Sequence, residues 1–327
     1  MARIYFATNR DPEPPDAPRT FGGHFNPAAF DNLRFGRATV VGKQVREVTV
    51  ADETLSADHA RARLGSQEIF GELLAAMRRG ADTLVYVHGY NVSFTDALRG
   101  GGAIRRALRT SRGLNVVVFS WPSDGSMLPF LAYKHDRSDA RASAAAFARA
   151  LLKLEAFLVK VRRGAECGAR LHLLCHSMGN YVLRYGIQEV RRQTGGLPRL
   201  FDTILLMAAD EDYDAFELDF KLAPLPEMGE SVNVYFNSGD TALVISDRTK
   251  ANPARLGSRG PRSPLTVPGN VTLVDASEVV GGLVEHSYFV DEPVVVRDLR
   301  AVLAGKAADR IAHRRYVAAQ NRYVLSK

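Results

Sequence analysis

The chain has 327 residues, of which 46% are hydrophobic and 24% charged, with a formal net charge of +7. These proportions are those of an ordinary globular protein and exclude a disordered chain. No apolar run approaches the roughly 20 residues that a membrane span needs, and no apolar segment near the start resembles a signal peptide. We therefore expect a cytoplasmic protein without a membrane span.

The positive charge is spread along the chain rather than gathered in one motif. Basic residues recur over 99–112, 141–163 and 297–327, where exposed helix faces explain them. No helix-turn-helix, RNP or zinc-finger pattern is present, so we expect no nucleic-acid partner. Cys167 and Cys175 would lie about 26 Å apart along a strand, too far for a disulfide, which agrees with a reducing compartment.

Strand-like apolar runs alternate with helix-like stretches along most of the chain. An opening strand over 3–8 precedes a Pro-rich loop and an antiparallel pair over 37–42 and 46–51. After this pair, amphipathic helices and buried strands alternate. Helices are expected over 66–80, 95–111, 137–163 and from 177 to a stop at Gly195-Gly196, and strands over 83–90, 115–123, 171–177, 202–210, 231–240 and 271–277.

This alternation favours a mostly parallel, doubly wound α/β sheet, because parallel strands need crossover connections that place helices on both faces. No internal repeat and no long polar linker divides the chain, so we expect one domain over 1–327 with a strand and loop extension over 1–65. The segments 211–230 and 247–270 are candidate lids, although ordinary surface excursions explain them equally well.

The stretch RLHLLCHSMGNYVLRYG, residues 170–186, runs from an apolar strand through a serine flanked by small residues straight into a helix. Such a turn forces Ser177 into strained backbone angles. Proteins keep this strain mainly where it presents a nucleophile. We therefore interpret Ser177 as the nucleophile of a strand-to-helix elbow.

Other reactive side chains follow the ends of neighbouring strands, where α/β sheets bind ligands. Asp240 ends one strand and His286 follows the last, which gives the order Ser, Asp, His of elbow hydrolases. Asp210 is the alternative acid. It opens a run of acids over 210–214 whose mutual repulsion suits a solvated surface or helix N-terminus. Asp240 is favoured, because a tight turn and a helix expected directly after it would hold its carboxylate rigidly.

In such a site the imidazole takes the serine proton and the carboxylate fixes the imidazole. The backbone N–H groups of Met178 and Tyr90 are the expected oxyanion donors. His88 and Trp121 are candidate pocket residues, with a structural role as the alternative for each. No metal-ligand cluster and no phosphate-binding glycine loop is present, so neither a metal nor a cofactor is expected.

The segments VYVHGYNVSF, VVVFSWPSDG, CHSMGN and SGDTALVIS are similar to those of a bacterial α/β-hydrolase family of uncharacterised function. The resemblance covers about residues 80–290 and the opening YFATNR strand. It implies an eight-stranded hydrolase fold, esterase or lipase-like chemistry, and a Ser177, Asp240 and His286 triad. Cys175 departs from the pattern, because the elbow usually begins with glycine; cysteine is small enough to be tolerated there.

The expected activity is cleavage of a small-molecule carboxylic ester through an acyl-enzyme. An amidase, peptidase or thioesterase with the same triad is the alternative within enzymes. A non-catalytic interaction module is a third interpretation, which an intact triad argues against. The sequence specifies neither the acyl chain length nor the oligomeric state.

Overall fold

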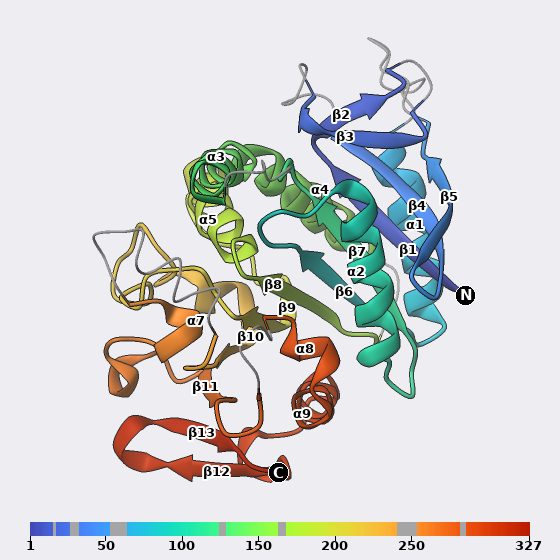
Figure 1. Cartoon of the computed structure of the whole chain (residues 1–327). Helices are drawn as coiled ribbons and strands as arrows, with labels where there is room; N and C mark the ends of the chain where they lie inside the picture. Colours follow the sequence, from blue (N-terminus) through green and yellow to red (C-terminus); the bar gives the residue numbers. More distant parts are fainter. Residues whose placement is uncertain are drawn as a thin grey trace.

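The computed structural model describes residues 1–15, 18–26, 33–52, 64–123, 129–162, 168–240, 254–281 and 286–327. Its centre is an eleven-stranded sheet in the order β12-β13-β11-β10-β9-β8-β6-β7-β1-β4-β5 (Figure 1). A separate two-stranded ribbon pairs β2 with β3. The strands are β1 (Ala2–Thr8), β2 (Arg10–Glu13), β3 (Thr20–Phe25), β4 (Arg34–Val41), β5 (Gln44–Val50), β6 (Asp82–Val87), β7 (Leu114–Ser120), β8 (Leu171–His176), β9 (Phe201–Met207), β10 (Gly229–Phe236), β11 (Val271–Asp275), β12 (Arg314–Val317) and β13 (Arg322–Leu325).

Eight neighbouring strands of this sheet, in the order β13-β11-β10-β9-β8-β6-β7-β1, run parallel to one another. The predicted antiparallel pair β4–β5 extends one edge of the sheet, and β12 closes the other. The mostly parallel sheet is confirmed, but the expected number of about eight strands was too low. The two strands of this sheet that were missed in the sequence, β12 and β13, are four residues long and rich in arginine and tyrosine. They therefore lack the apolar run that marks a buried strand.

Helices cover both faces of the sheet (Figure 1). Residues alternate along β6, so that Val85 and Val87 join the core beneath α1, α4 and α5, while Leu84 and Tyr86 join the core beneath α2, α8 and α9. Burial on both faces explains the nearly continuous apolar strands. The helices are α1 (Gly65–Arg78), α2 (Phe94–Ala107), α3 (Pro129–Ala142), α4 (Ala144–Arg162), α5 (Gly179–Thr194), α7 (Leu256–Arg259), α8 (Tyr288–Asp291) and α9 (Pro293–Leu303), and short 3₁₀ turns cover Leu225–Met228, Pro264–Thr266, Ala308–Arg310 and Ala318–Gln320.

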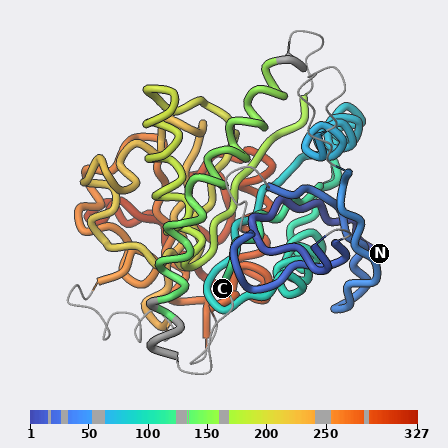
Figure 2. The backbone as a smooth tube through the Cα atoms, turned by 90° about the horizontal axis from the view of Figure 1, so that it is seen from above, coloured from blue at the N-terminus to red at the C-terminus, as the bar shows by residue number. Residues whose placement is uncertain are grey.

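The segment 137–163 was expected as one long helix, but its described residues, 137–162, lie in two helices. Ser143 separates α3 from α4, and its fully buried hydroxyl accepts a hydrogen bond from the side-chain amide of Asn9. Figure 2 shows the two helices following one another along a single path, shown in green. Apolar residues therefore recur across the break, which explains why the sequence pattern reads as continuous.

Helix α2 lies close against the sheet because it contains consecutive glycines. A Cβ atom on Gly101 would lie 2.7 Å from Val118, and one on Gly102 would lie 2.8 Å from Val40. Real Cβ atoms do not approach neighbours so closely, so the helix could not keep this position with larger residues. The end of α2 is thereby brought against the amino ends of β1 and β7.

The N-terminal extension is part of the main sheet, since β1 pairs with β7 and β4 pairs with β1. The candidate lid 211–230 packs several side chains inside, including Leu222, Leu225 and Met228. Of the second candidate lid, 247–253 lies outside the described residues, as does the helix expected directly after Asp240. Within the described residues, no helix combines the length and apolar character required to cross a membrane.

Candidate active site

Ser177 lies in the turn between β8 and α5 with a φ of 52°, a left-handed conformation that is strained for a residue with a side chain. Two neighbouring glycines make room for it. A Cβ atom on Gly179 would lie 2.5 Å from the carbonyl oxygen of Val87, and one on Gly89 would lie 2.8 Å from Cβ of Ser177. The turn therefore has the tight geometry that the sequence pattern predicts.

The backbone of this turn is fixed by buried hydrogen bonds. The side-chain amide of Asn180 donates to the carbonyl oxygens of Ser177, at 2.9 Å, and Cys175, at 3.2 Å. The N–H of Ser177 donates to the carbonyl of Met207 at the end of β9. Asn180 is fully buried, and no role was predicted for it from the sequence. A polar residue in the first turn of an otherwise apolar helix face was the available signal.

Cys175, which replaces the usual first glycine of the elbow, is fully buried in the core beneath α4 and α5. Burial raises the pKa of its thiol well above the ordinary value, because the thiolate would lose its hydration. The side chain thus remains a neutral packing group. This environment argues against Cys175 as a competing nucleophile.

Asp240 and His286 form a hydrogen-bonded pair. The Nδ1–H of His286 donates to Oδ2 of Asp240 across 2.7 Å, and the side chain of Asp240 is only 1% exposed. Asp240 follows β10 in a turn closed by a hydrogen bond from its N–H to the carbonyl of Asn237. With Nδ1 donating to the carboxylate, Nε2 is left as the proton acceptor of the imidazole.

His176, for which the sequence predicted no role, joins His286 to the elbow. Its Nε2 donates to the carbonyl oxygen of His286 at 3.0 Å, and the centres of the two rings lie 4.7 Å apart. Burial holds the pKa of His176 well below its ordinary value, and neighbouring His286 adds to this effect. The ring is therefore neutral and can donate through Nε2. Because His176 directly precedes Ser177, this contact brings His286 close to the turn that carries Ser177.

The alternative acid, Asp210, has a different environment. Its carboxylate accepts a hydrogen bond from the hydroxyl of Tyr133 and lies 3.5 Å from Nε of the fully buried Arg255. The run of acids over 210–214, expected on a solvated surface, lies in a partly buried network of ion pairs. Its pairs are Asp210 and Asp212 with Arg255, Asp212 and Asp214 with Lys221, and Glu211 with Arg184.

Glu211 is the member of this network whose pKa is raised to near neutrality. Burial raises its pKa to about 7, although Arg184 at 3.3 Å opposes the shift. Its Oε1 is buried without a hydrogen-bond partner among the described residues, which further disfavours the charged form. The network therefore contains a buried carboxyl group that can titrate near neutral pH.

The turn after β6, which carries Tyr90, is built around His88. The Nδ1 of His88 donates to the carbonyl of Gly89 at 2.9 Å, and its Nε2 accepts from the N–H of Trp121 at 3.2 Å. Burial, with a contribution from Arg10, lowers the pKa of His88 to about 3, so the ring stays neutral. Trp121 Nε1 donates in return to the carbonyl of His88. Both side chains are fully buried, and they brace the turn from within.

A second set of contacts holds the outer side of this turn. Asp136 is buried and accepts hydrogen bonds from the hydroxyl of Ser123, at 2.6 Å, and from the N–H of Asn91, at 3.2 Å. The guanidinium of Arg10 donates to the carbonyl of Val92. Asn91 has a positive φ of 53°. The backbone of the turn is therefore held from both sides, which is the rigidity that an oxyanion donor requires.

Met178 is the N-cap residue of α5, and its side chain is fully buried. The first N–H groups of a helix have no partner within the helix, so they can face a negative charge near Ser177. Tyr90 is half-buried, with its ring centre 6.0 Å from that of Tyr133. Within the described residues, no group of three His, Cys, Asp or Glu side chains could hold a metal ion.

Similar solved structures include lipase B of Aspergillus fumigatus (10% identity, TM-score 0.42), a double mutant of the esterase E40 (19%, 0.27) and the acylaminoacyl peptidase of Pyrococcus horikoshii (11%, 0.26). The matches cover 70%, 69% and 84% of this chain but only 53%, 65% and 42% of those proteins. These similarities are too weak to carry an argument about activity. No curated protein matches the chain.

A family match covers most of the chain. Residues 66–306 match the family described as an alpha/beta hydrolase of unknown function, DUF900. The matched region runs from α1 into the turn after α9 and contains Ser177, Asp240 and His286. The mostly parallel sheet, covered by helices on both faces, is the fold that this description requires. The chain therefore belongs to this family of α/β hydrolases.

Proposed function

We propose that the chain is a serine hydrolase that cleaves carboxylic esters through an acyl-enzyme. Ser177 is the nucleophile, His286 the general base and acid, and Asp240 the carboxylate that orients the imidazole. The observation that carries this proposal is the hydrogen bond from His286 to the buried Asp240, since it leaves Nε2 as the acceptor. The hydrogen bond between His176 and the carbonyl group of His286 also supports the assignment, because it holds His286 close to Ser177.

The reaction proceeds in two halves. Oγ of Ser177 attacks the ester carbonyl carbon while its proton passes to Nε2 of His286. The resulting oxyanion is stabilised by the N–H groups of Met178 and Tyr90. His286 then gives the proton to the departing alkoxide, which leaves as an alcohol. Water attacks the acyl-enzyme in the same way, which releases the carboxylic acid and restores the serine.

An activated ester and a matched amide test this proposal. We expect purified protein to hydrolyse p-nitrophenyl esters, with the rate falling by orders of magnitude in Ser177→Ala at unchanged thermal stability. A residual rate about a thousandfold above water is compatible, because the oxyanion donors persist. Full turnover by Ser177→Ala would contradict the acyl-enzyme. A higher kcat/KM on the p-nitroanilide than on the ester with the same acyl group would favour the amidase alternative.

A panel of p-nitrophenyl esters of increasing acyl length defines the substrate class. Because the leaving group is constant, differences in kcat/KM report how the site accepts the acyl chain. A thioester with the best acyl group, compared in the same assay conditions, tests the thioesterase alternative. Preference for the oxygen ester over the thioester, relative to their rates with hydroxide, supports the carboxylesterase assignment.

A further inference from the structure

A hollow of about 480 Å³ lies at the edge of the sheet opposite Ser177, beside the amino ends of β1 and β7. Ala2 and Leu114 open these two strands, and Gly42 belongs to the turn between β4 and β5. We call this site the arginine hollow, because four of its lining side chains are arginines from two helices and from the segment between α2 and β7. They are Arg105, Arg106, Arg109 and Arg300.

Main-chain carbonyl groups hold three of these arginines in place. Nε of Arg105 donates to Leu114 at 3.0 Å, and Nη1 of Arg106 donates to Gly42 at 2.9 Å. Nε of Arg300 donates to Ala107, the last residue of α2, at 2.7 Å. A carbonyl fixes the direction of a guanidinium without cancelling its charge. Arg105 and Arg300 are thereby oriented through Nε, which leaves their two terminal nitrogens for other acceptors.

No carboxylate belongs to the described lining of this hollow, and none of its four arginines takes part in an ion pair within the described part of the chain. Other arginines of the chain differ. Arg314 is paired with Asp298, and Arg99 on the same helix as Arg105 is paired with Asp96. The arginine hollow therefore concentrates positive charge that no carboxylate among the described residues pairs with, in a protein whose net charge is +7.

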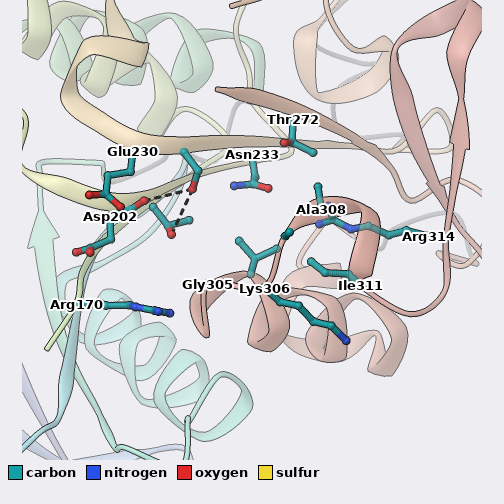
Figure 3. Close-up of a pocket in the computed structure, with 14 residues that line it drawn as sticks. Arg170, Asp202, Glu230, Asn233, Thr272, Gly305, Lys306, Ala308, Ile311 and Arg314 are labelled. Carbon is teal, nitrogen blue, oxygen red and sulfur yellow. Dashed lines mark hydrogen bonds between the residues drawn. The ribbon is translucent and has the colours of Figure 1, made fainter. Parts of the chain in front are cut away.

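The neighbouring hollow at the same edge provides a contrast (Figure 3). It measures about 360 Å³ and lies across the starts of β9, β10 and β11. Figure 3 shows Asp202 and Glu230 on one side of it and Lys306 on the other. Its charge is mixed, whereas that of the arginine hollow is of one sign. An anion is therefore favoured at the arginine hollow over its neighbour.

The carboxyl end of a helix favours basic side chains, which explains why Arg105 and Arg106 lie in the last turn of α2. It does not explain Arg300, which reaches the end of α2 from α9. Nor does it explain why Arg106 is tied to the β4–β5 turn, a third element. Basic residues that converge from separate elements around one concavity are the arrangement expected of a binding site rather than of a solvated helix face.

We propose that the arginine hollow binds an anion carrying two linked phosphate groups. Planar guanidinium groups donate paired N–H bonds that match phosphate oxygens, and several of them compensate more than one negative charge. The volume lies within the range of small-ligand pockets and exceeds what one phosphate fills. Because the hollow lies opposite Ser177, its ligand is distinct from the ester that the proposed active site cleaves, and the two proposals stand or fall separately.

Isothermal titration calorimetry with inorganic pyrophosphate tests whether the arginine hollow binds such an anion. We expect saturable binding by the unmodified chain, weaker binding of inorganic monophosphate, and at least about tenfold weaker pyrophosphate binding in Arg106→Gln and in Arg109→Gln. Both side chains are exposed, so the variants should fold. Arg99→Gln is the matched control, since it removes the same charge from α2 outside the hollow. Its affinity should remain within about twofold of the unmodified chain.

The proposal would be overturned by no binding of pyrophosphate, by equal weakening in Arg99→Gln, or by a loss confined to Lys306→Gln, which would move the site to the neighbouring hollow. Binding of a single-stranded oligonucleotide without binding of pyrophosphate would also contradict it. Vesicles of phosphatidylcholine that contain phosphatidylinositol bisphosphate identify the source. Sedimentation with them that requires Arg109 assigns the phosphates to a lipid headgroup, and pyrophosphate binding without sedimentation assigns them to a soluble ligand.

Discussion

A Cβ atom on Gly89 would lie 2.8 Å from the Cβ atom of Ser177. The turn after β6 thus rests directly on the elbow after β8. On the other side of the elbow, Gly179 packs against the carbonyl groups of Val87 and His88. The ends of β6 and β8 therefore form one packed unit, and direct contact sets the position of Tyr90 relative to the serine.

Replacing Gly89 with alanine should push the turn after β6 away from the elbow that carries Ser177. We expect Gly89→Ala to lower kcat by about a hundredfold or more on a p-nitrophenyl ester, because displacing the turn removes one oxyanion donor. Gly71→Ala is the control, since no atom lies within 4 Å of the added Cβ on the exposed face of α1. It should leave kcat unchanged and slightly stabilise the fold. Normal turnover by Gly89→Ala would mean that the turn has no part in catalysis.

Substitution of the two candidate acids should affect different properties of the protein. Asp240→Asn should lower kcat by about ten-thousandfold, because an amide favours the wrong tautomer of His286. Asp210→Asn should act mainly on stability, by about 1–3 kcal/mol in urea unfolding, since it leaves the buried Arg255 with less compensation. Kinetics and unfolding on both variants separate these effects. A larger loss of kcat in Asp210→Asn than in Asp240→Asn would show that Asp210, and not Asp240, orients His286.

His176 is a positioning residue in this account. His176→Phe keeps an aromatic ring against His286 but removes the hydrogen bond to its carbonyl group. We expect kcat to fall about tenfold with little change in KM, the effect of one misplaced hydrogen bond. His176→Gln retains a donor and should recover part of the loss. Equal kinetics of the two variants would show that the hydrogen bond does not position the base.

Glu211 should make stability depend on pH. Its pKa in the fold, about 7, lies above the ordinary 4.5 because of burial. The folded chain therefore holds this proton between about pH 4.5 and 7, where the unfolded chain has released it. The stabilisation is complete below pH 4.5 and is lost as the pH rises to 7.

Glu211→Gln removes this titratable group, so a comparison with the unmodified chain isolates its contribution to stability. The stability of the variant relative to the unmodified chain should rise by about 1–3 kcal/mol from pH 4.5 to 7 and stay level above that. Urea unfolding at a series of pH values measures the difference. A constant difference across this range would show that Glu211 is ionised throughout.

The sheet and the turn were predictable because their signals are local. The apolar strands from β6 to β11 appear as runs in the sequence, and the stop of α5 is marked by Gly195, which has a φ of 76°. The elbow was visible because small residues must flank Ser177. The order of Ser177, Asp240 and His286 along the chain is enough to specify a hypothesis for the site.

Features that depend on distant partners were not predictable. The acids after β9 look solvated in the sequence, because two of the basic residues that compensate them, Arg184 and Arg255, lie in other segments of the chain. The roles of Asn180 and His176 depend on carbonyl groups that only the folded backbone brings to them. The break at Ser143 was hidden by the continuous apolar pattern on both sides of it.

The central claim, that Ser177 is an activated nucleophile, is tested most directly by a fluorophosphonate probe and mass spectrometry of the labelled peptide. We expect stoichiometric labelling on Ser177 at neutral pH, slower labelling when His286 is replaced by alanine, and none at this peptide in Ser177→Ala. Burial keeps Cys175 on the same peptide protonated and unreactive. A folded protein that remains unlabelled at Ser177, or that is labelled on another residue with equal turnover, would contradict the account.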